Sequence, residues 1–265
     1  MKKVSRINLR RSLFLFRLQG NTNHVKNTIL KNLDLVDRAM NKNREEIRFA
    51  DYISKINIKG TSQFYQDLFV TYALKNKENG FFVEFGACDG VHLSNTYLLE
   101  KKLNWKGILS EPAKIWHEEL KRNRNCKINI DCISPFSGEK VGFSETIRPE
   151  LSTINTHLKN DLHSSRRIVN LNYEVNTLSL NDLLSLNDAP TEIDLISIDT
   201  EGSELEIIEQ FDFDRYQTKI IIIEHNYDKT RKVRLKKIFE NQNFKLVFHN
   251  ISGPDYWFIS NELKI

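Results

Sequence analysis

The chain has 265 residues, of which 40% are hydrophobic and 28% charged, a composition typical of a globular protein rather than a disordered one. No run approaches the ~20 apolar residues that cross a bilayer, and the apolar segment Ser12–Phe16 is far shorter. Three cysteines at irregular spacing form neither a disulfide framework nor a zinc motif, so we expect a reducing, cytoplasmic location.

The net charge of +4 is unevenly distributed, since residues 1–50 hold 12 Lys/Arg against 4 Asp/Glu. We therefore divide the chain into a basic N-terminal extension, residues 1–55, partly helical or disordered, and a domain, residues 56–265. Helical spacing of apolar residues predicts a short helix over Val25–Met40. Residues 1–20 could contact an anionic membrane surface, or form a solvated arm. Sequence-specific nucleic-acid binding is not expected, because aromatic residues are not interleaved with basic ones in the domain.

From about residue 60, short apolar strands alternate with amphipathic helices. In chain order, the expected elements are helix Leu68–Leu74, strand Phe81–Phe85, helix Asn95–Lys102, strand Gly107–Ser110, helix Ala113–Asn123, strand Lys127–Ile133, strand Asp194–Ile198, helix Ser203–Gln210 and strand Lys219–Glu224. Continuous apolar strands separated by helices are typical of a parallel sheet covered on both faces.

Two further regions differ from this alternation. Phe244–His249 and Tyr256–Ile259 flank a segment rich in turn residues, which predicts an antiparallel hairpin at the C-terminal end. Residues 135–176 show a weaker pattern, which we interpret as a hairpin with Lys140–Phe143 as one arm, inserted on the substrate side.

The first predicted strand ends in the loop Glu84–Gly90. Open α/β sheets bind ligands at the carboxyl ends of their parallel strands, and Gly86 and Gly90 permit close backbone approach and unusual backbone angles. The acidic residues Glu84 and Asp89 would repel a pyrophosphate and attract a sulfonium or an ammonium group. The loop thus favours a cationic cofactor, although a tight turn with surface acids would show the same residues.

Glu111 follows the second predicted strand, 25 residues after Gly86. An acid at this place suits two hydrogen bonds from ribose hydroxyls, as in nucleotide-binding folds generally. Alternatively, Glu111 and Pro112 simply terminate a strand.

Acids also follow the fourth predicted strand. Asp199, Glu201 and Glu204 lie within six residues, and carboxylates next to a buried strand are costly unless they are solvated or used. Glu204 is explained by the start of the next helix, where the dipole favours an acid. Asp199 and Glu201 are left as candidates for the reaction or for a ligand.

The fifth predicted strand ends in Glu224, His225 and Asn226, which should reach the same crevice. His225 could accept a proton from a hydroxyl near neutral pH, or be structural. Asp199 together with Glu224, His225 or Asn226 could hold a divalent cation, but no metal site is assigned because their separation depends on the fold.

Several of these segments, in this order, make the chain resemble the FkbM family of S-adenosylmethionine-dependent methyltransferases. The similar segments span about residues 60–260 and are Ser62–Asp67, Phe82–Gly90, Leu93–Thr96, Trp105–Pro112, Thr177–Leu183, Ile198–Glu204 and Glu224–Asn226. Cys88 stands where such loops often carry Asn or another small polar residue, a difference of little consequence if the loop backbone makes the contact.

The resemblance implies a Rossmann-like class I methyltransferase fold of the α/β class, with a mostly parallel sheet, a C-terminal antiparallel hairpin and helices on both faces. It implies S-adenosylmethionine as cofactor and a hydroxyl of a sugar, glycan or small metabolite as methyl acceptor. The residues expected to bind the cofactor are Glu84, Gly86, Ala87, Asp89, Gly90, Glu111 and Asp199. Those expected in catalysis are Asp199, Glu201 and His225.

Two other functions fit parts of the sequence. One is a non-catalytic S-adenosylmethionine-binding adaptor, docked through its basic N-terminal extension. The other is a nicotinamide-dependent oxidoreductase, which is disfavoured because the loop lacks the G-x-G-x-x-G pattern and contains Asp89.

Overall fold

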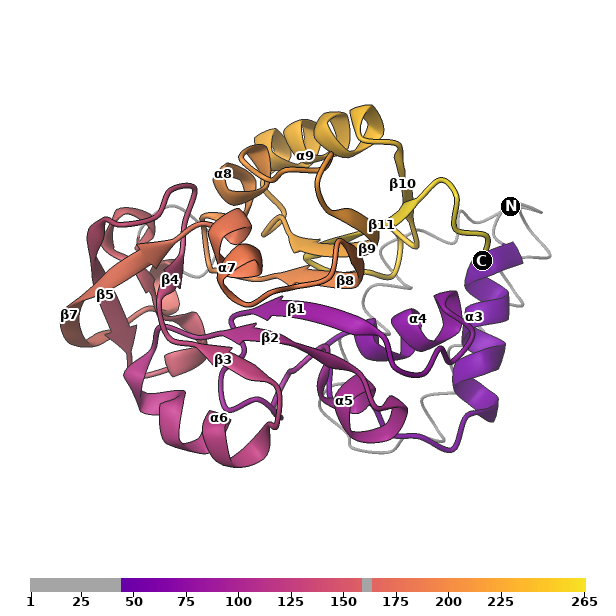
Figure 1. Ribbon diagram of the computed structural model, residues 1–265, viewed down its shortest axis with the longest axis horizontal. Coiled ribbons are helices and arrows are strands. Elements are labelled where there is room, and N and C mark those ends of the chain that lie inside the picture. The colour runs from indigo at the N-terminus through magenta and orange to yellow at the C-terminus, as the bar shows by residue number, and fades with distance from the viewer. Residues whose placement is uncertain (1–43, 159–163) are drawn as a thin grey trace, which may run out of the picture.

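The computed structural model describes residues 44–158 and 164–265 (Figure 1). The helix predicted over Val25–Met40 and the basic residues 1–20 lie outside the described residues. The helices are α3 (Arg44–Lys55), α4 (Gln66–Ala73), α5 (Tyr97–Leu103), α6 (His117–Asn123), α7 (Leu180–Leu186), α8 (Glu204–Glu209) and α9 (Lys229–Asn241). The strands are β1 (Phe81–Phe85), β2 (Lys106–Ser110), β3 (Lys127–Asn129), β4 (Cys132–Ile133), β5 (Lys140–Thr146), β6 (Thr153–Ile154), β7 (Val169–Leu178), β8 (Glu192–Ile198), β9 (Gln217–Glu224), β10 (Phe244–Val247) and β11 (Asp255–Ser260).

Seven strands form the main sheet, in the order β10-β11-β9-β8-β1-β2-β3. β1 pairs in parallel with β2 and β8, and β8 pairs in parallel with β9. β11 runs antiparallel to both β9 and β10, which makes it the reversed strand of the sheet. The predicted α/β fold, with its mostly parallel sheet and C-terminal antiparallel hairpin, is therefore confirmed.

Helices cover both faces of this sheet, as Figure 1 shows, with α7, α8 and α9 on one side and α4, α5 and α6 on the other. Each face has its own apolar core. Leu183, Ile208 and Phe239 pack against one face, and Phe69, Leu99 and Leu120 contribute to the core on the other. Strands covered on both faces must be apolar throughout, which explains the uninterrupted Ile220–Ile223 run of β9, whose four residues are all buried.

Helix α3 packs on the domain, although its residues belong to the predicted N-terminal extension. Phe49 is 1% exposed and has ring contacts with Phe69, Phe248 and Trp257. The predicted boundary at residue 55 thus coincides with the end of a helix that contributes to the core.

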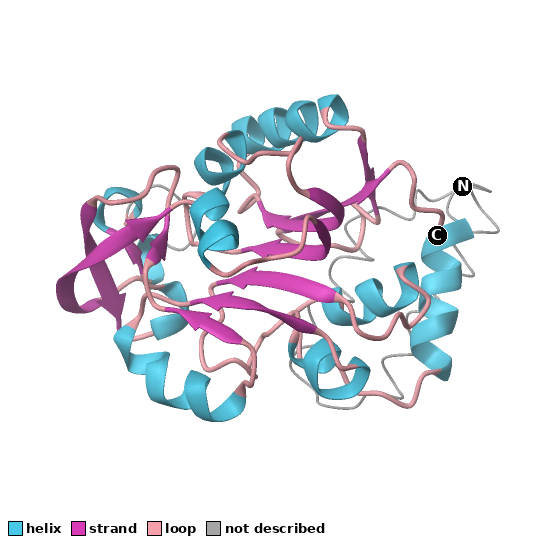
Figure 2. Ribbon diagram, in the orientation of Figure 1, coloured by secondary structure: helices cyan, strands magenta, loops and turns pink. Residues whose placement is uncertain are grey.

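A second, four-stranded sheet has the order β4-β7-β5-β6. The arrows of β1 and β2 in Figure 2 point towards it, so it lies beyond the carboxyl ends of the central strands. The predicted hairpin arm Lys140–Phe143 is part of β5, which pairs antiparallel with β7. The insertion therefore lies beside the carboxyl edge of the main sheet.

Some element boundaries differ from the prediction. The single strand predicted over Lys127–Ile133 is wrong, because β3 joins the main sheet and β4 joins the second one. The predicted helix Ala113–Asn123 begins as a 3₁₀ turn, Lys114–Trp116, before α6. Helix α9 was not predicted, and its buried residues are only Leu235 and Phe239.

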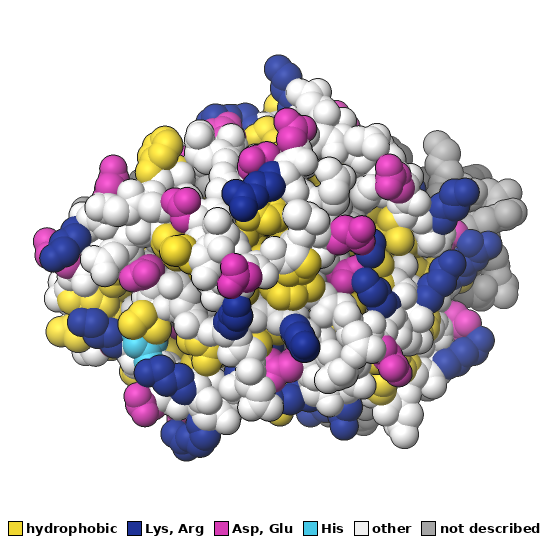
Figure 3. All heavy atoms as spheres, in the orientation of Figure 1, with side chains coloured by type: hydrophobic (Ala, Val, Ile, Leu, Met, Phe, Trp, Pro, Cys, Tyr) yellow, Lys and Arg dark blue, Asp and Glu magenta, His cyan; other side chains and the backbone are white. Residues whose placement is uncertain are grey.

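Across residues 44–158 and 164–265, none of the helices combines the length and apolarity needed to cross a bilayer. On the face shown in Figure 3, basic and acidic side chains are interspersed rather than gathered by sign.

Candidate functional site

A cavity of about 870 Å³ opens at the carboxyl ends of β1, β2, β8 and β9. Its lining includes Gly86, Glu111, Asp199, Glu201 and Glu224 among residues from the main sheet, the β5–β7 insertion and the C-terminal hairpin. The fold thereby brings together most of the acids that the sequence analysis selected at separate strand ends. The volume lies within the range of about 300–1,000 Å³ that is typical of small-molecule sites.

Glu84 lies at the edge of this cavity and is bound by protein groups. It is 3% exposed and accepts hydrogen bonds from the Ser94 and Thr96 hydroxyls. The backbone N–H of Asn95 donates to its other oxygen, at 2.6 Å. An Arg124 nitrogen lies 3.7 Å from Glu84. Glu84 therefore holds the loop and the start of α5 in place, with its charge compensated inside the protein.

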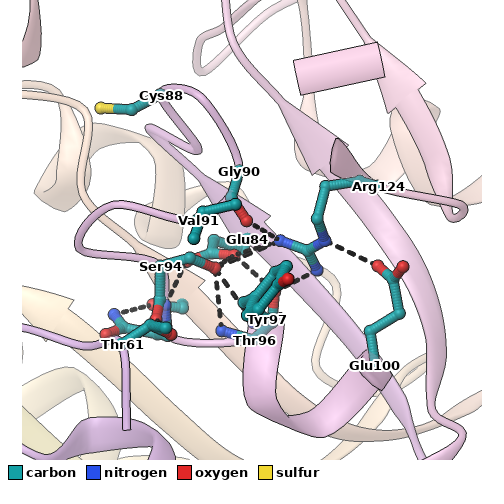
Figure 4. A network of polar contacts seen from close by, with 12 residues as sticks. Thr61, Glu84, Cys88, Gly90, Val91, Ser94, Thr96, Tyr97, Glu100 and Arg124 are labelled. Carbon is teal, nitrogen blue, oxygen red and sulfur yellow. Dashed lines mark hydrogen bonds and ion pairs between the residues drawn. The ribbon is translucent and has the colours of Figure 1, made fainter. Parts of the chain in front are cut away.

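Arg124 joins this network to the glycine loop (Figure 4). Its side chain is fully buried, and its Nε donates to Glu100 at 2.6 Å. The remaining guanidinium nitrogens donate to the Gly90 carbonyl at 3.0 Å and to the Thr96 hydroxyl at 2.8 Å. Arg124 thus connects α6, α5 and the loop after β1 through a single buried cation.

Three other loop residues predicted to bind the cofactor do not line the cavity: Ala87, Asp89 and Gly90. Asp89 Oδ1 accepts hydrogen bonds from the backbone N–H groups of Val91 and His92, which closes a turn. Gly90 has a φ of 80°, and a Cβ there would lie 2.6 Å from the Arg124 side chain. These residues shape the loop.

At Gly86 the backbone of the loop lies directly against Asp199 at the end of β8. Its φ is 70°, and a Cβ at this position would lie 2.1 Å from the carbonyl oxygen of Asp199. Only glycine fits this geometry, because any side chain would both adopt a strained backbone conformation and overlap the end of β8. The loop after β1 therefore rests directly on the segment that carries Asp199.

Glu111 is oriented by two backbone donors. The N–H of Cys88 donates to one oxygen at 2.9 Å, and the N–H of Ala113 donates to the other at 2.8 Å. Burial raises the pKa of Glu111 to about 7, and the nearby Glu145 carboxylate also raises it, against the lowering effect of the two hydrogen bonds. The carboxylate is thus fixed at the cavity wall beside the glycine loop, where its oxygens can accept further hydrogen bonds.

Asp199, Glu201 and Glu224 form a compact acidic cluster, and each contributes an oxygen lying within 4.8 Å of the other two. Burial raises the pKa of Asp199 well above its usual range, and the neighbouring Glu201 carboxylate adds to the effect. Burial likewise raises the pKa of Glu224, with Asp199 as the next contribution. The carboxyl ends of β8 and β9 therefore hold like charges that repel each other in a dry environment.

Two arginines fix the loop that follows β8. Arg167 donates to Glu201 at 2.7 Å and to the Leu151 carbonyl at 2.9 Å, which ties the insertion to the acidic cluster. Arg231 of α9 pairs with Glu204 at 3.0 Å. Glu204 also accepts hydrogen bonds from the backbone N–H groups of Thr200 and Gly202, so its role at the start of α8 matches the sequence analysis.

His225 is not among the residues that line the cavity. It is 2% exposed, its ring packs edge-on against Tyr256 at 4.4 Å, and its Nδ1 accepts a hydrogen bond from the Tyr227 N–H. The neighbouring residue on β9, Glu224, reaches the cavity instead. Residues on a strand alternate between faces, so adjacent positions at one strand end point in opposite directions.

Several polar residues of the cavity were not predicted from sequence, among them Gln66 and Asp255. Gln66 donates to Asp255 at 2.8 Å across 189 positions of sequence, and Asp255 pairs with Glu224 in the β9–β11 register. Burial raises the pKa of Asp255 to about 7. The sequence offers only a weak indication that these two residues belong to a site: Gln66 lies in the polar segment that leads into α4, and Asp255 ends a predicted turn.

The sequence model of the methyltransferase FkbM domain matches residues 84–246, more than half of the chain. The chain belongs to the FkbM methyltransferase family. Membership of this family implies that it uses S-adenosylmethionine as methyl donor, and the strand order described above is that of a Rossmann-like class I methyltransferase. Among curated proteins, none matches the sequence.

Two solved structures are similar to this chain at low sequence identity. One is a Pyrococcus horikoshii protein provisionally assigned as an RNA methyltransferase, with 12% identity, a TM-score of 0.39, and coverage of 80% of this chain and 98% of its own. Another is precorrin-6y C5,15-methyltransferase from Geobacter metallireducens, with 10% identity, a TM-score of 0.40, and coverage of 72% and 84%. The family assignment rests on the sequence model.

Removing the buried cation beside the glycine loop should destabilise the protein. Substitution Arg124→Met removes the guanidinium from Glu84 and Glu100, of which Glu100 keeps its ion pair with Lys101. Breaking a buried ion pair by removing one partner costs about 3–5 kcal/mol. The free energy of unfolding in urea should fall by this amount, while the exposed Arg122→Met serves as control and should change it by less than about 0.5 kcal/mol. Equal stability of the two variants would show that the network is dispensable.

Substitution Gly86→Ala should distort the cavity without removing any polar group. The added methyl must displace the Asp199 carbonyl, so the melting temperature and any ligand binding in the cavity should both fall. Gly138→Ala is the control for backbone strain, because Gly138 also has a positive φ, 84°, but has nothing within 4 Å of an added Cβ. Ligand affinity that is equal in the two variants would contradict the proposed closeness of Gly86 to the ligand.

Proposed function

We propose that the protein is an S-adenosylmethionine-dependent O-methyltransferase that acts on a hydroxyl of a sugar, a glycan or a small metabolite. The observation that supports this most strongly is the arrangement at the cavity wall. Glu111, Gly86 and Asp199 lie at the carboxyl ends of β2, β1 and β8, three adjacent strands of the sheet. S-adenosylmethionine fits this arrangement if its ribose lies at Glu111 and its sulfonium lies near Asp199.

Glu111 would bind the ribose of the cofactor. Its two oxygens are already held by the Cys88 and Ala113 backbones, so the carboxylate is oriented before the ligand arrives. Preorganised acceptors lose little entropy on binding, which favours recognition of the two ribose hydroxyls. The methionine part of the cofactor would then pass over Gly86 towards the acids at the end of β8.

Methyl transfer would occur beside the acidic cluster. The acceptor oxygen forms a bond to the methyl carbon while the bond from that carbon to sulfur breaks, so the sulfonium becomes the neutral thioether of S-adenosylhomocysteine. The hydroxyl proton passes to a carboxylate of the cluster, for which Asp199 and Glu201 are the candidates. The protein contributes alignment of the three reacting atoms and removal of the proton.

The acceptor would occupy the part of the cavity formed by the segment before α4, the β5–β7 insertion and the C-terminal hairpin. Phe64 and Pro254 line this part together with polar residues, and Tyr227 lines the cavity from the loop after β9. Aromatic faces next to hydrogen-bonding groups suit the alternating apolar and hydroxyl surfaces of a sugar.

All three cysteines are free thiols, which supports a cytoplasmic location.

Cofactor binding is tested by calorimetric titration of the protein with S-adenosylmethionine and, separately, with NAD. We expect heat of binding with S-adenosylmethionine only, and at least a tenfold weaker affinity in Glu111→Ala, since a hydrogen-bonded charged acceptor contributes about 1.5–3 kcal/mol. Binding of NAD in the absence of S-adenosylmethionine binding would instead identify a nicotinamide-dependent enzyme.

The affinity for S-adenosylmethionine should also depend on pH. Because the pKa of Glu111 is about 7 in the free protein, the carboxylate is mostly protonated at pH 6 and mostly charged at pH 8. If the charged form binds the ribose, the dissociation constant should rise about tenfold from pH 8 to pH 6. Glu111→Gln, which does not titrate, is the matched comparison; an identical pH dependence in this variant would remove Glu111 from the explanation.

Enzyme and adaptor are distinguished by transfer of a labelled methyl group from S-adenosylmethionine to a glycan extract. Substitution Asp199→Asn keeps the size of the side chain and should lower the rate by about 10²–10⁴, the usual contribution of a positioned acid or base. The exposed Asp214→Asn should retain full activity. Wild-type protein that binds the cofactor but labels no acceptor would favour the adaptor, and an active Asp199→Asn variant would exclude Asp199 from catalysis.

A further inference from the structure

We propose that Asp199, Glu201 and Glu224 bind a hard divalent cation, Mg²⁺ or Mn²⁺, at the floor of the cavity. The role given to this cation below rests on the proposed methyl transfer, whereas its binding does not. The sequence analysis considered Asp199 with Glu224, His225 or Asn226. The structure instead brings Glu201 to Asp199 and Glu224, and it packs the His225 ring against Tyr256.

The separation of the three carboxylates fits a single ion. Oxygens from all three lie within 4.8 Å of one another. Metal–oxygen distances are about 2.0–2.6 Å, so two oxygens on opposite sides of one ion lie roughly 4–5 Å apart. Carboxylate oxygens without sulfur ligands favour Mg²⁺, Mn²⁺ or Ca²⁺ over zinc or copper.

An unsatisfied oxygen is an independent indication of a ligand at this place. Asp199 Oδ1 is buried and has no hydrogen-bond partner among the described residues. Leaving a polar acceptor buried and unpaired is costly, and such groups are normally hydrogen-bonded or bound to a metal. A cation in the cluster would satisfy this oxygen directly.

The distribution of arginines leads to the same conclusion. Among the described residues, buried ion pairs reach Glu84, Glu201 and Glu204, of which Glu84 and Glu201 line the cavity. In the same part of the chain, no ion pair within 4.0 Å reaches Asp199 or Glu224, although Glu224 is only 6% exposed. Within the cluster, Arg167 therefore compensates Glu201, whereas Asp199 and Glu224 could pair with an added cation.

Two of the three carboxylates are held in position by neighbouring side chains. Arg167 donates to Glu201 Oε2 at 2.7 Å, and Asn226 Nδ2 donates to Glu224 Oε2 at 2.7 Å. Hydrogen bonds of this kind orient metal ligands and are a usual feature of metal sites. Asn226 therefore acts as a positioning residue for Glu224.

The cation would act on the methyl acceptor. A hydroxyl bound to a divalent ion loses its proton more readily, which makes the oxygen a better nucleophile at neutral pH. Its proton would leave to a neighbouring carboxylate or to water, and the oxygen would then attack the methyl carbon. The cation would also fix the acceptor oxygen in line with the sulfonium.

Binding is tested with Mn²⁺ by electron paramagnetic resonance, because the signal of free aqueous Mn²⁺ decreases when the ion binds. The full-length protein, freed of metal with a chelator, is titrated with Mn²⁺ in the presence and absence of S-adenosylmethionine. We expect one ion per chain, competition by Mg²⁺, and at least tenfold weaker binding in both Asp199→Asn and Glu224→Gln. Glu118→Gln is the matched control, since that side chain is 86% exposed and remote from the cavity, and it should bind Mn²⁺ like the wild type.

Both cluster variants should fold, because replacing one of several crowded acids by an amide reduces repulsion; thermal melts verify this before the titration. Absence of Mn²⁺ binding at millimolar concentration, with and without S-adenosylmethionine, would overturn the proposal, as would equal binding by the cluster variants and the control. Calorimetry with S-adenosylmethionine separates the two proposals. Cofactor binding without Mn²⁺ binding contradicts only the metal site, and Mn²⁺ binding without cofactor binding contradicts only the methyltransferase function.

Discussion

The cost of burying carboxylates at the carboxyl edge of a parallel sheet is the constraint on which this site depends. Arg124, Arg167 and Arg231 each extend from a different element to one of these acids and compensate its charge. Asp199 and Glu224 line the cavity, and burial together with neighbouring carboxylates raises both pKa values, which favours the protonated forms. A cationic ligand would stabilise the charged carboxylates instead, and this coupling links the geometry of the loops to the proposed chemistry.

The strands of the main sheet were predictable because their positions depend on local patterns. Continuous apolar runs such as Ile220–Ile223 identify strands covered on both faces, and the glycines after β1 and the turn before β11 mark where the chain changes direction. Helix α9 was missed because only Leu235 and Phe239 are buried on a helix otherwise rich in Lys and Arg. The segment Lys127–Ile133 was assigned to one strand because periodicity does not show that its two halves join different sheets.

The site was only partly predictable. Strand ends correctly selected Glu111, Asp199 and Glu201 as cavity residues, since topology alone brings such ends together. What each carboxylate contacts depends on tertiary partners distant in sequence. Glu84, predicted from sequence to bind a cationic cofactor, lines the cavity and also lies 3.7 Å from Arg124, a residue 40 positions later. No local pattern around either residue indicates this pairing.

The central claim is that S-adenosylmethionine binds between Glu111 and the end of β8. A crystal structure of the protein with S-adenosylhomocysteine, the demethylated cofactor, tests it most directly. The account predicts that both ribose hydroxyls lie within hydrogen-bond distance of the Glu111 carboxylate, that the methionine part crosses Gly86, and that the sulfur faces the cluster of Asp199, Glu201 and Glu224. Density for the nucleoside elsewhere in the cavity, or with the adenine beside Asp199 and the sulfur directed away from it, would contradict the account.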